Sequence, residues 1–127
     1  MPRTLKVRGT CATLPVLPKC TNRELLLWAL RRRRRFRVVG ESMLPTLRAG
    51  DEVLLDTHAY DHAAPLAGDI VVAFHPEQPD LKIIKRVGAV LANGLFLSSD
   101  NASAGSDSRQ FGVVGMDKVV GRVNGRF

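Results

Sequence analysis

The chain has 127 residues, which is the length of one domain and enough to bury a core without disulfide or metal staples. Its net charge of +7 is uneven: residues 1–35 contain ten Lys and Arg against one acidic residue (net +9), and residues 36–127 contain nine against eleven (net −2). Nucleic-acid-binding domains usually carry their cations along the folded binding face, so this asymmetry argues against that class and indicates a basic N-terminal arm.

Residues 1–20 are predicted to form an extended or disordered leader, because Pro15 and Pro18 interrupt them and no regular hydrophobic period is present. They lack the unbroken apolar segment of a secretory signal peptide. We therefore expect the leader to stay on the protein.

Residues 21–35 predict a short basic amphipathic helix. Thr21 and Glu24 have capping-box spacing, an apolar run around Trp28 follows, and the arginines suit a helix C-terminus. The apolar run is about a third of the roughly 20 residues that cross a bilayer, so we expect no transmembrane span. For Arg31–Arg35 three interpretations stay open: a solvated helix end, a peripheral anchor on anionic lipid together with Trp28, or a docking site for an acidic partner or nucleic acid.

The residues that most often bind metals give no metal-site pattern. Cys11 and Cys20 lack zinc-ligand spacing, and we expect free thiols in a reducing compartment. His58 and His62 are four residues apart, but their segment is a predicted loop without a third ligand. No metal site is therefore expected.

From residue 36 onward the pattern changes to short β-strands. Segments rich in Val, Ile and Leu and bounded by Gly, Pro and Asp are found at 36–40, 51–56, 68–75, 81–90, 94–99 and 118–123. The ANG triplet at 92–94 is typical of a hairpin turn that pairs 87–91 with 95–98. The sequence therefore predicts a mainly β domain from 36 to 127.

Ser42 and Lys85 are the candidate catalytic residues. Ser42 is in a loop that leaves a predicted strand, and strand alternation places Lys85 on the same face as Ile83 and Val87. A serine hydroxyl becomes a good nucleophile when a base takes its proton, and a desolvated lysine can act in place of histidine. The lysine pKa must then fall from about 10.4 to about 7–8, which burial can achieve. The alternative is an edge lysine whose ammonium stays in water.

The motifs around both residues resemble those of type I signal peptidases, in the same order. GESMLPT (40–46) is similar to the nucleophile box, GDEVLLD (50–56) and GDIVVAF (68–74) to the following strands, KRV (85–87) to the general-base box, and SSDNASAGSDSRQFG (98–112) to the last box. The resemblance implies a coiled antiparallel β-sheet or partly open barrel with a short N-terminal helix. It also implies a serine endopeptidase, with Ser42 as nucleophile and Lys85 as general base, that needs no metal or organic cofactor.

The resemblance further implies supporting roles for apolar and charged residues. Apolar side chains near the serine and lysine would line the substrate groove or pack beneath it as ordinary core: Phe36, Val38, Met43, Leu47 and Ile84. Asp107 and Arg109 match the charged residues of the last box, and we expect them to support the site structurally.

Three positions depart from the family pattern. Ser99 stands where relatives usually have a glycine, so the turn at Asp100 and Asn101 is expected to differ locally. The Ser42 N–H is expected to donate to the oxyanion, but the hydroxyl that many relatives add falls at Gly40. The serine that hydrogen-bonds the lysine in relatives falls at Gly105, between Ser103 and Ser106. Either of these serines is a candidate for that role.

Within the family, RVVGESMLPTLRAGD (37–51), PDLKIIKRV (79–87) and SDSRQFG (106–112) are most similar to the soluble branch that removes the leader from the precursor of nickel-type superoxide dismutase. We therefore expect a protease in the cytoplasm, free or peripheral to the membrane, whose partner is that precursor. The alternatives are a general type I signal peptidase acting on exported preproteins at the membrane, and a non-catalytic binding module with a basic arm. A self-cleaving repressor is disfavoured, because residues 1–41 contain no Ala-Gly or Cys-Gly bond.

Overall fold

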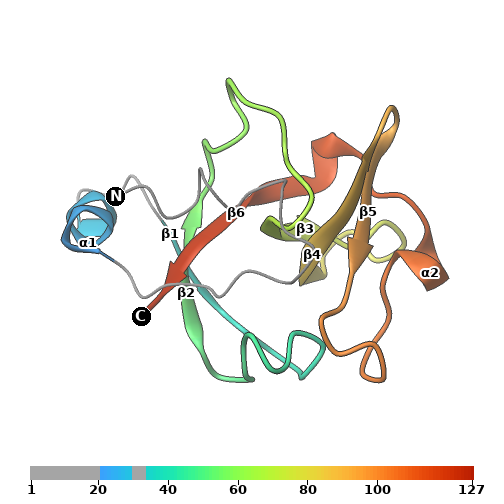
Figure 1. Ribbon diagram of the computed structural model, residues 1–127, viewed down its shortest axis with the longest axis horizontal. Coiled ribbons are helices and arrows are strands. Elements are labelled where there is room, and N and C mark those ends of the chain that lie inside the picture. Colours follow the sequence, from blue (N-terminus) through green and yellow to red (C-terminus); the bar gives the residue numbers. More distant parts are fainter. Residues whose placement is uncertain (1–20, 30–33) are drawn as a thin grey trace.

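The computed structural model describes residues 21–29 and 34–127, and strands β1 to β6 of this part of the chain form one antiparallel sheet (Figure 1). The strands are β1 (Arg34–Arg37), β2 (Glu52–Asp56), β3 (Ile70–Phe74), β4 (Lys82–Leu91), β5 (Gly94–Ser98) and β6 (Val119–Arg126). Their order across the sheet is β1-β2-β6-β3-β4-β5. The predicted mainly β fold with an open antiparallel sheet is confirmed, and each predicted strand overlaps an observed one.

The helical elements are short: α1 (Asn22–Ala29), α2 (Ser108–Phe111) and the 3-10 turn η1 (Met116–Lys118). The helix predicted over 21–35 does not reach Arg34 and Arg35, which belong to β1. These arginines pair with Leu55 and Leu54 of β2, and Arg35 forms an ion pair with Glu52 at 3.0 Å. Strand pairing and this ion pair therefore take the place of the predicted helix end.

Several predictions on the basic arm fall outside the described residues. These are the leader over 1–20 with Cys11 and Cys20, Arg31–Arg33, and the side chain of Trp28. In the part of the chain that is described, no helix is long and apolar enough to cross a membrane.

The sheet buries apolar side chains on both faces, in two clusters. Within β3, Ile70 and Val72 belong to the first cluster and Val71 and Ala73 to the second, because successive side chains point to opposite faces. The first cluster contains Val38, Met43, Leu47, Val53, Leu55, Ile70, Val72, Ile84 and Val123; the second contains Val71, Ala73, Val87, Leu95, Leu97 and Val114. The side chains of the neighbouring strand β4 likewise alternate between the two faces.

The β4–β5 hairpin brings the lysine strand beside the last motif of the sequence. Its register pairs Leu91 with Gly94, as the ANG turn predicts, and a β-bulge between Val87 and Ala89 then shifts it by one residue, so that Val87 pairs with Leu97. The pairing also places Arg86 opposite Ser98. The residue that follows Ser98 is consequently the next cross-strand neighbour of Lys85.

Candidate active site

Ser42 lies in the loop between β1 and β2, and two kinds of contact hold this loop. Met43 and Leu47 are fully buried in the first cluster, so the chain is anchored directly after the serine. From the segment after β5, the Asn101 N–H donates to the Ser42 carbonyl at 2.7 Å, and the Asn101 side-chain amide donates to the Glu41 carbonyl at 3.2 Å. The half-buried Ser42 side chain is thereby presented from a fixed backbone.

A buried ion pair ties the same loop to β4. The Arg86 guanidinium donates from Nε and Nη2 to the two Asp100 carboxylate oxygens, each at 2.9 Å. Only 4% of the Arg86 side chain and 2% of the Asp100 side chain are exposed. Thr46 of the serine loop donates its hydroxyl to Asp100 at 2.7 Å, and Arg86 Nη1 donates to the Gly68 carbonyl at 2.8 Å. One carboxylate therefore joins β4 to the loop that carries Ser42.

Lys85 is buried, with 5% of its surface exposed, and it shares its face of β4 with Ile83 and Val87 of the second cluster. Burial lowers the pKa of the Lys85 ammonium below its ordinary value of 10.5, and the nearby Asp107 carboxylate opposes this with a smaller upward effect. Among the described residues, no carboxylate lies within ion-pair distance of Lys85. The environment thus favours the neutral amine.

Ser42 and Lys85 both lie beside Gly105. A Cβ placed on Gly105 would lie 3.4 Å from the Ser42 Cβ and 3.8 Å from the Lys85 Nζ. The serine side chain and the lysine amine therefore border the same point in space, although they come from a loop and from a strand 43 positions apart in the sequence. This convergence brings together the two residues that the sequence singled out.

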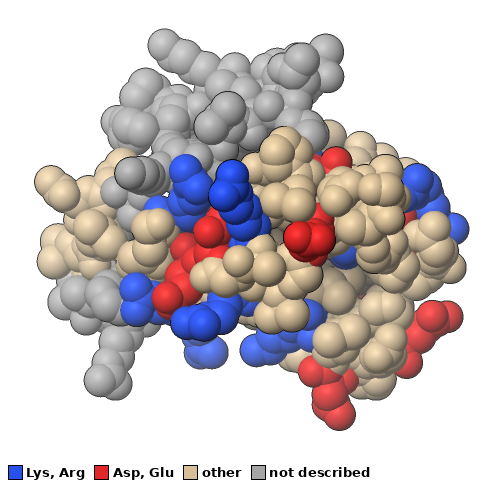
Figure 2. All heavy atoms as spheres, turned by 90° about the horizontal axis from the view of Figure 1, so that it is seen from below, with Lys and Arg blue, Asp and Glu red and all other residues tan. Residues whose placement is uncertain are grey.

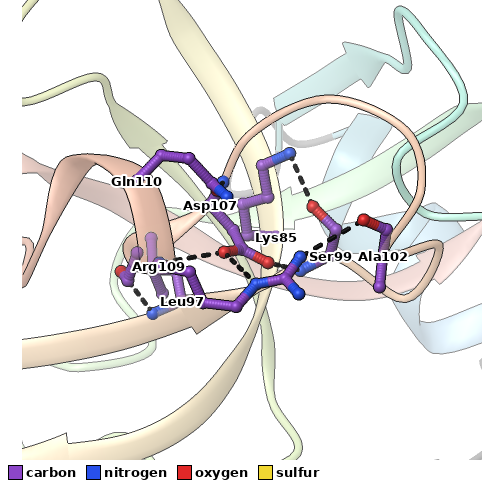
Figure 3. A network of polar contacts seen from close by, with 8 residues as sticks. Lys85, Leu97, Ser99, Ala102, Asp107, Arg109 and Gln110 are labelled. Atoms are coloured by element: carbon purple, nitrogen blue, oxygen red, sulfur yellow. Dashed lines mark hydrogen bonds and ion pairs between the residues drawn. The ribbon is translucent and has the colours of Figure 1, made fainter.

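The serine that hydrogen-bonds Lys85 is Ser99, which the sequence motifs marked as a departure in the turn but not as a partner of the lysine. Figure 3 shows the Lys85 Nζ donating to the Ser99 Oγ, at 3.1 Å. Ser103 and Ser106 are exposed, and Ser103 instead donates its hydroxyl to the Asn101 side chain at 2.8 Å. Neither of the predicted serines makes the lysine contact. The register of the turn would place residue 100 across from Lys85, and the β-bulge between Val87 and Ala89 shifts it by one residue, so that Ser99 lies there instead. Gly88 within the strand is the sequence signal that was available, because a glycine inside a strand often marks a bulge.

Asp107 organises the backbone around Ser99 (Figure 3). Its carboxylate accepts from the Ser99 N–H at 2.9 Å and, at 3.0 Å each, from the Arg109 N–H and Nε. Asp107 also begins α2 as its N-cap, with Gln110 completing a capping box. Burial acts to raise the Asp107 pKa, but the Arg109 side chain, the two N–H donors and the Arg109 charge outweigh it and hold the pKa below 3.8. These contacts fit the structural role predicted for Asp107 and Arg109.

The apolar residues predicted for the substrate groove lie mostly beneath the surface. The buried members are Val38, Met43, Leu47 and Ile84, and Phe36 packs half-buried against the same cluster. These four therefore support the serine loop from below rather than line an open groove. Next to the loop, Val39 is 82% exposed and offers apolar surface three residues before Ser42.

Gly40 stands where many relatives have a hydroxyl residue, and its backbone φ is +83°. A Cβ at this position would have no neighbouring atom within 4 Å, so space does not exclude a side chain there. A serine would nevertheless be strained in this left-handed conformation, which glycine adopts readily. The local backbone thus explains the glycine, and position 40 supplies no side-chain donor to an oxyanion.

An open antiparallel sheet that buries a lysine amine beside a loop serine is suited to hydrolysis with lysine in place of histidine. The family model "Signal peptidase, peptidase S26" matches residues 25–93, which include Ser42 and Lys85. The chain therefore belongs to the S26 signal peptidase family.

Two curated relatives are consistent with this family. "Signal peptidase I" of Aquifex aeolicus is 36% identical over 52 residues, covering 41% of this chain and 20% of that protein. "Mitochondrial inner membrane protease subunit 1" of Xenopus tropicalis is 30% identical over 104 residues, covering 66% of this chain and 62% of that protein. The chain thus spans less than two thirds of either relative.

Proposed function

We propose that the protein is a serine endopeptidase that removes an N-terminal segment from a precursor protein, with Ser42 as nucleophile and Lys85 as general base. The observation that carries the proposal is the approach of the Ser42 side chain and the buried Lys85 amine to one point at Gly105. Membership of the S26 family supports the reaction class and a precursor protein as substrate.

The proposed acylation step uses the neutral Lys85 amine. Ser42 Oγ bonds to the scissile carbonyl carbon while its proton moves to Lys85 Nζ, and the carbonyl oxygen takes up negative charge. The Ser42 N–H is the proposed donor to that oxyanion, a kind of contact whose loss costs about 100- to 1000-fold in rate. When the C–N bond breaks, the Lys85 ammonium returns the proton to the leaving amine, and the new ester on Ser42 remains.

Deacylation repeats the same transfers with water. Lys85 takes a proton from a water molecule, whose oxygen attacks the ester carbon, and then returns the proton to Ser42 Oγ as the C–O bond breaks. Each step needs Lys85 to be neutral before it accepts a proton, which its burial favours. We propose that an extended substrate pairs with exposed sheet edges, where backbone hydrogen bonds give affinity.

The proposed substrate is the precursor of nickel-type superoxide dismutase, which rests on the sequence resemblance alone. The alternative is a general type I signal peptidase acting on exported preproteins at the membrane, as the name of the Aquifex relative suggests. A second alternative is a non-catalytic binding module with a basic arm. The face in Figure 2 does not favour it, because basic and acidic side chains lie interspersed over the described surface there rather than in one basic patch.

The test is incubation of the full chain with the dismutase precursor and, separately, with a preprotein carrying an Ala-x-Ala cleavage site. The mass of each product gives its new N-terminus, and Ser42→Ala is the matched inactive control. We expect cleavage of the dismutase precursor that Ser42→Ala abolishes. Cleavage of the preprotein alone would select the general peptidase, and cleavage of neither would contradict the proposed function.

Flotation of the full chain with lipid vesicles tests membrane contact, which bears on the cellular location. We propose a cytoplasmic enzyme whose membrane contact, if it forms, is peripheral and runs through Trp28 and Arg31–Arg35. Flotation with anionic vesicles is expected to leave most of the protein unbound. Firm binding that salt reverses would instead favour the general signal peptidase at the membrane.

A further inference from the structure

Lys85 has one hydrogen-bond partner among the described residues, and that partner is Ser99. The Lys85 Nζ donates to the Ser99 Oγ at 3.1 Å, and both residues are buried, with 5% and 9% of their surfaces exposed. A lysine side chain has several rotatable bonds and loses rotamer entropy when it is fixed. A partner that fixes the amine nitrogen is therefore needed if Lys85 is to stay directed toward Ser42.

Ser99 is itself held rigidly on the sheet side of the site. It directly follows β5, one step along the register that pairs Arg86 with Ser98. Its N–H donates to Asp107 at 2.9 Å, and that carboxylate is fixed in turn by Arg109. The Ser99 hydroxyl is thus presented from a strand end whose backbone is tied on both sides.

We infer that Ser99 is the positioning residue for Lys85: by accepting one N–H of the amine, it leaves the nitrogen lone pair directed toward Ser42. A neutral amine has two N–H donors and one lone pair, so an N–H bond to Ser99 does not occupy the electron pair that must take the serine proton. The inference rests on the proposed function, since it assigns the residue that prepares the proposed base.

Gly105 offers an independent way to test this role. A Cβ there would lie 3.8 Å from the Lys85 Nζ, so a serine at 105 would place a second hydroxyl beside the amine. The backbone φ of +72° makes a serine there somewhat strained. That strain is present with or without Ser99, so a double-mutant cycle separates it from the positioning effect.

The experiment measures kcat and KM of wild type, Ser99→Ala, Gly105→Ser and the double variant, on a fluorogenic peptide with an Ala-x-Ala site or on the precursor that the wild type cleaves. Ser98→Ala is the matched control, because its side chain points to the other face of the strand. We expect Ser99→Ala to lower kcat about 100-fold with KM unchanged, as for a misplaced catalytic group. Gly105→Ser is expected to recover much of that loss.

Full activity of Ser99→Ala, or a loss that Gly105→Ser does not recover in a folded double variant, would overturn the inference and leave the proposed function standing. If the wild type cleaves no substrate, the proposed function fails and the Lys85 amine is titrated by NMR in wild type and Ser99→Ala. Loss of an acceptor for the ammonium is expected to lower the Lys85 pKa further. An unchanged titration would contradict the contact.

Discussion

Lys85 and Arg86 are neighbours on β4 and similarly buried, but on the two faces of the strand they have different hydrogen-bond partners. Arg86 meets the Asp100 carboxylate through two 2.9 Å hydrogen bonds, so its charge is neutralised inside the fold. Lys85 donates to the Ser99 hydroxyl instead of a carboxylate, and its burial disfavours the charge. The partner that faces a buried cation therefore decides whether the fold stabilises or disfavours its charge.

The largest expected effect follows from replacing Lys85 with another cationic residue. Lys85→Arg keeps a positive side chain, but a guanidinium does not give up its proton near neutral pH, so it cannot serve as a base. We expect kcat/KM for precursor cleavage to fall about 100- to 10,000-fold, the contribution of a general base. Circular dichroism checks that the fold is retained.

Lys82→Arg is the matched control for this exchange, since Lys82 lies on the same strand and is exposed. Its activity is expected to equal that of the wild type. Equal activity of Lys85→Arg and Lys82→Arg would show that β4 carries no catalytic base, and the two faces of the strand would then not differ in chemistry.

A smaller effect, on stability alone, is expected when Arg86 on the opposite face of β4 is replaced. Arg86→Met leaves the Asp100 carboxylate buried without its partner, which costs about 3–5 kcal/mol of unfolding free energy. Arg37→Met removes an exposed partner of Glu52 and is expected to cost less than about 1 kcal/mol. Urea unfolding of both variants measures the difference, and similar losses would mean that the Asp100 pair does not hold the serine loop to β4.

The strands and the face of β4 that carries Lys85 were predictable from the sequence. Alternation over β4 placed Lys85 with Ile83 and Val87, and the ANG turn predicted the hairpin, because both follow from local backbone geometry. The bulge between Val87 and Ala89, which sets the register at Lys85, was not predicted. The approach of Ser42 to Lys85 was expected from motif order and not from any local rule. It depends on long-range contacts such as those of Asn101 and Asp100.

The partner of Lys85 could not be predicted by matching motif positions. Position 105 is a glycine, so the motif indicates the neighbouring Ser103 or Ser106, but both are exposed. The contact is made by Ser99, because strand pairing across the hairpin decides which side chain reaches the amine. The sequence also does not show how far an apolar side chain lies below the surface. Val38, Met43 and Ile84 have the apolar character expected of a substrate groove, but they are buried.

The most direct test of the proposed mechanism is an NMR titration of the Lys85 amine in the full chain, with its resonance assigned by its loss in Lys85→Arg. We expect half-protonation below pH 10.5, because burial disfavours the ammonium. Cleavage should then rise with pH through that midpoint. Stability should rise between the midpoint and pH 10.5, where the unfolded chain binds the extra proton. A midpoint at or above 10.5 would contradict the mechanism, since Lys85 would then be an ordinary charged side chain and not a base prepared for Ser42.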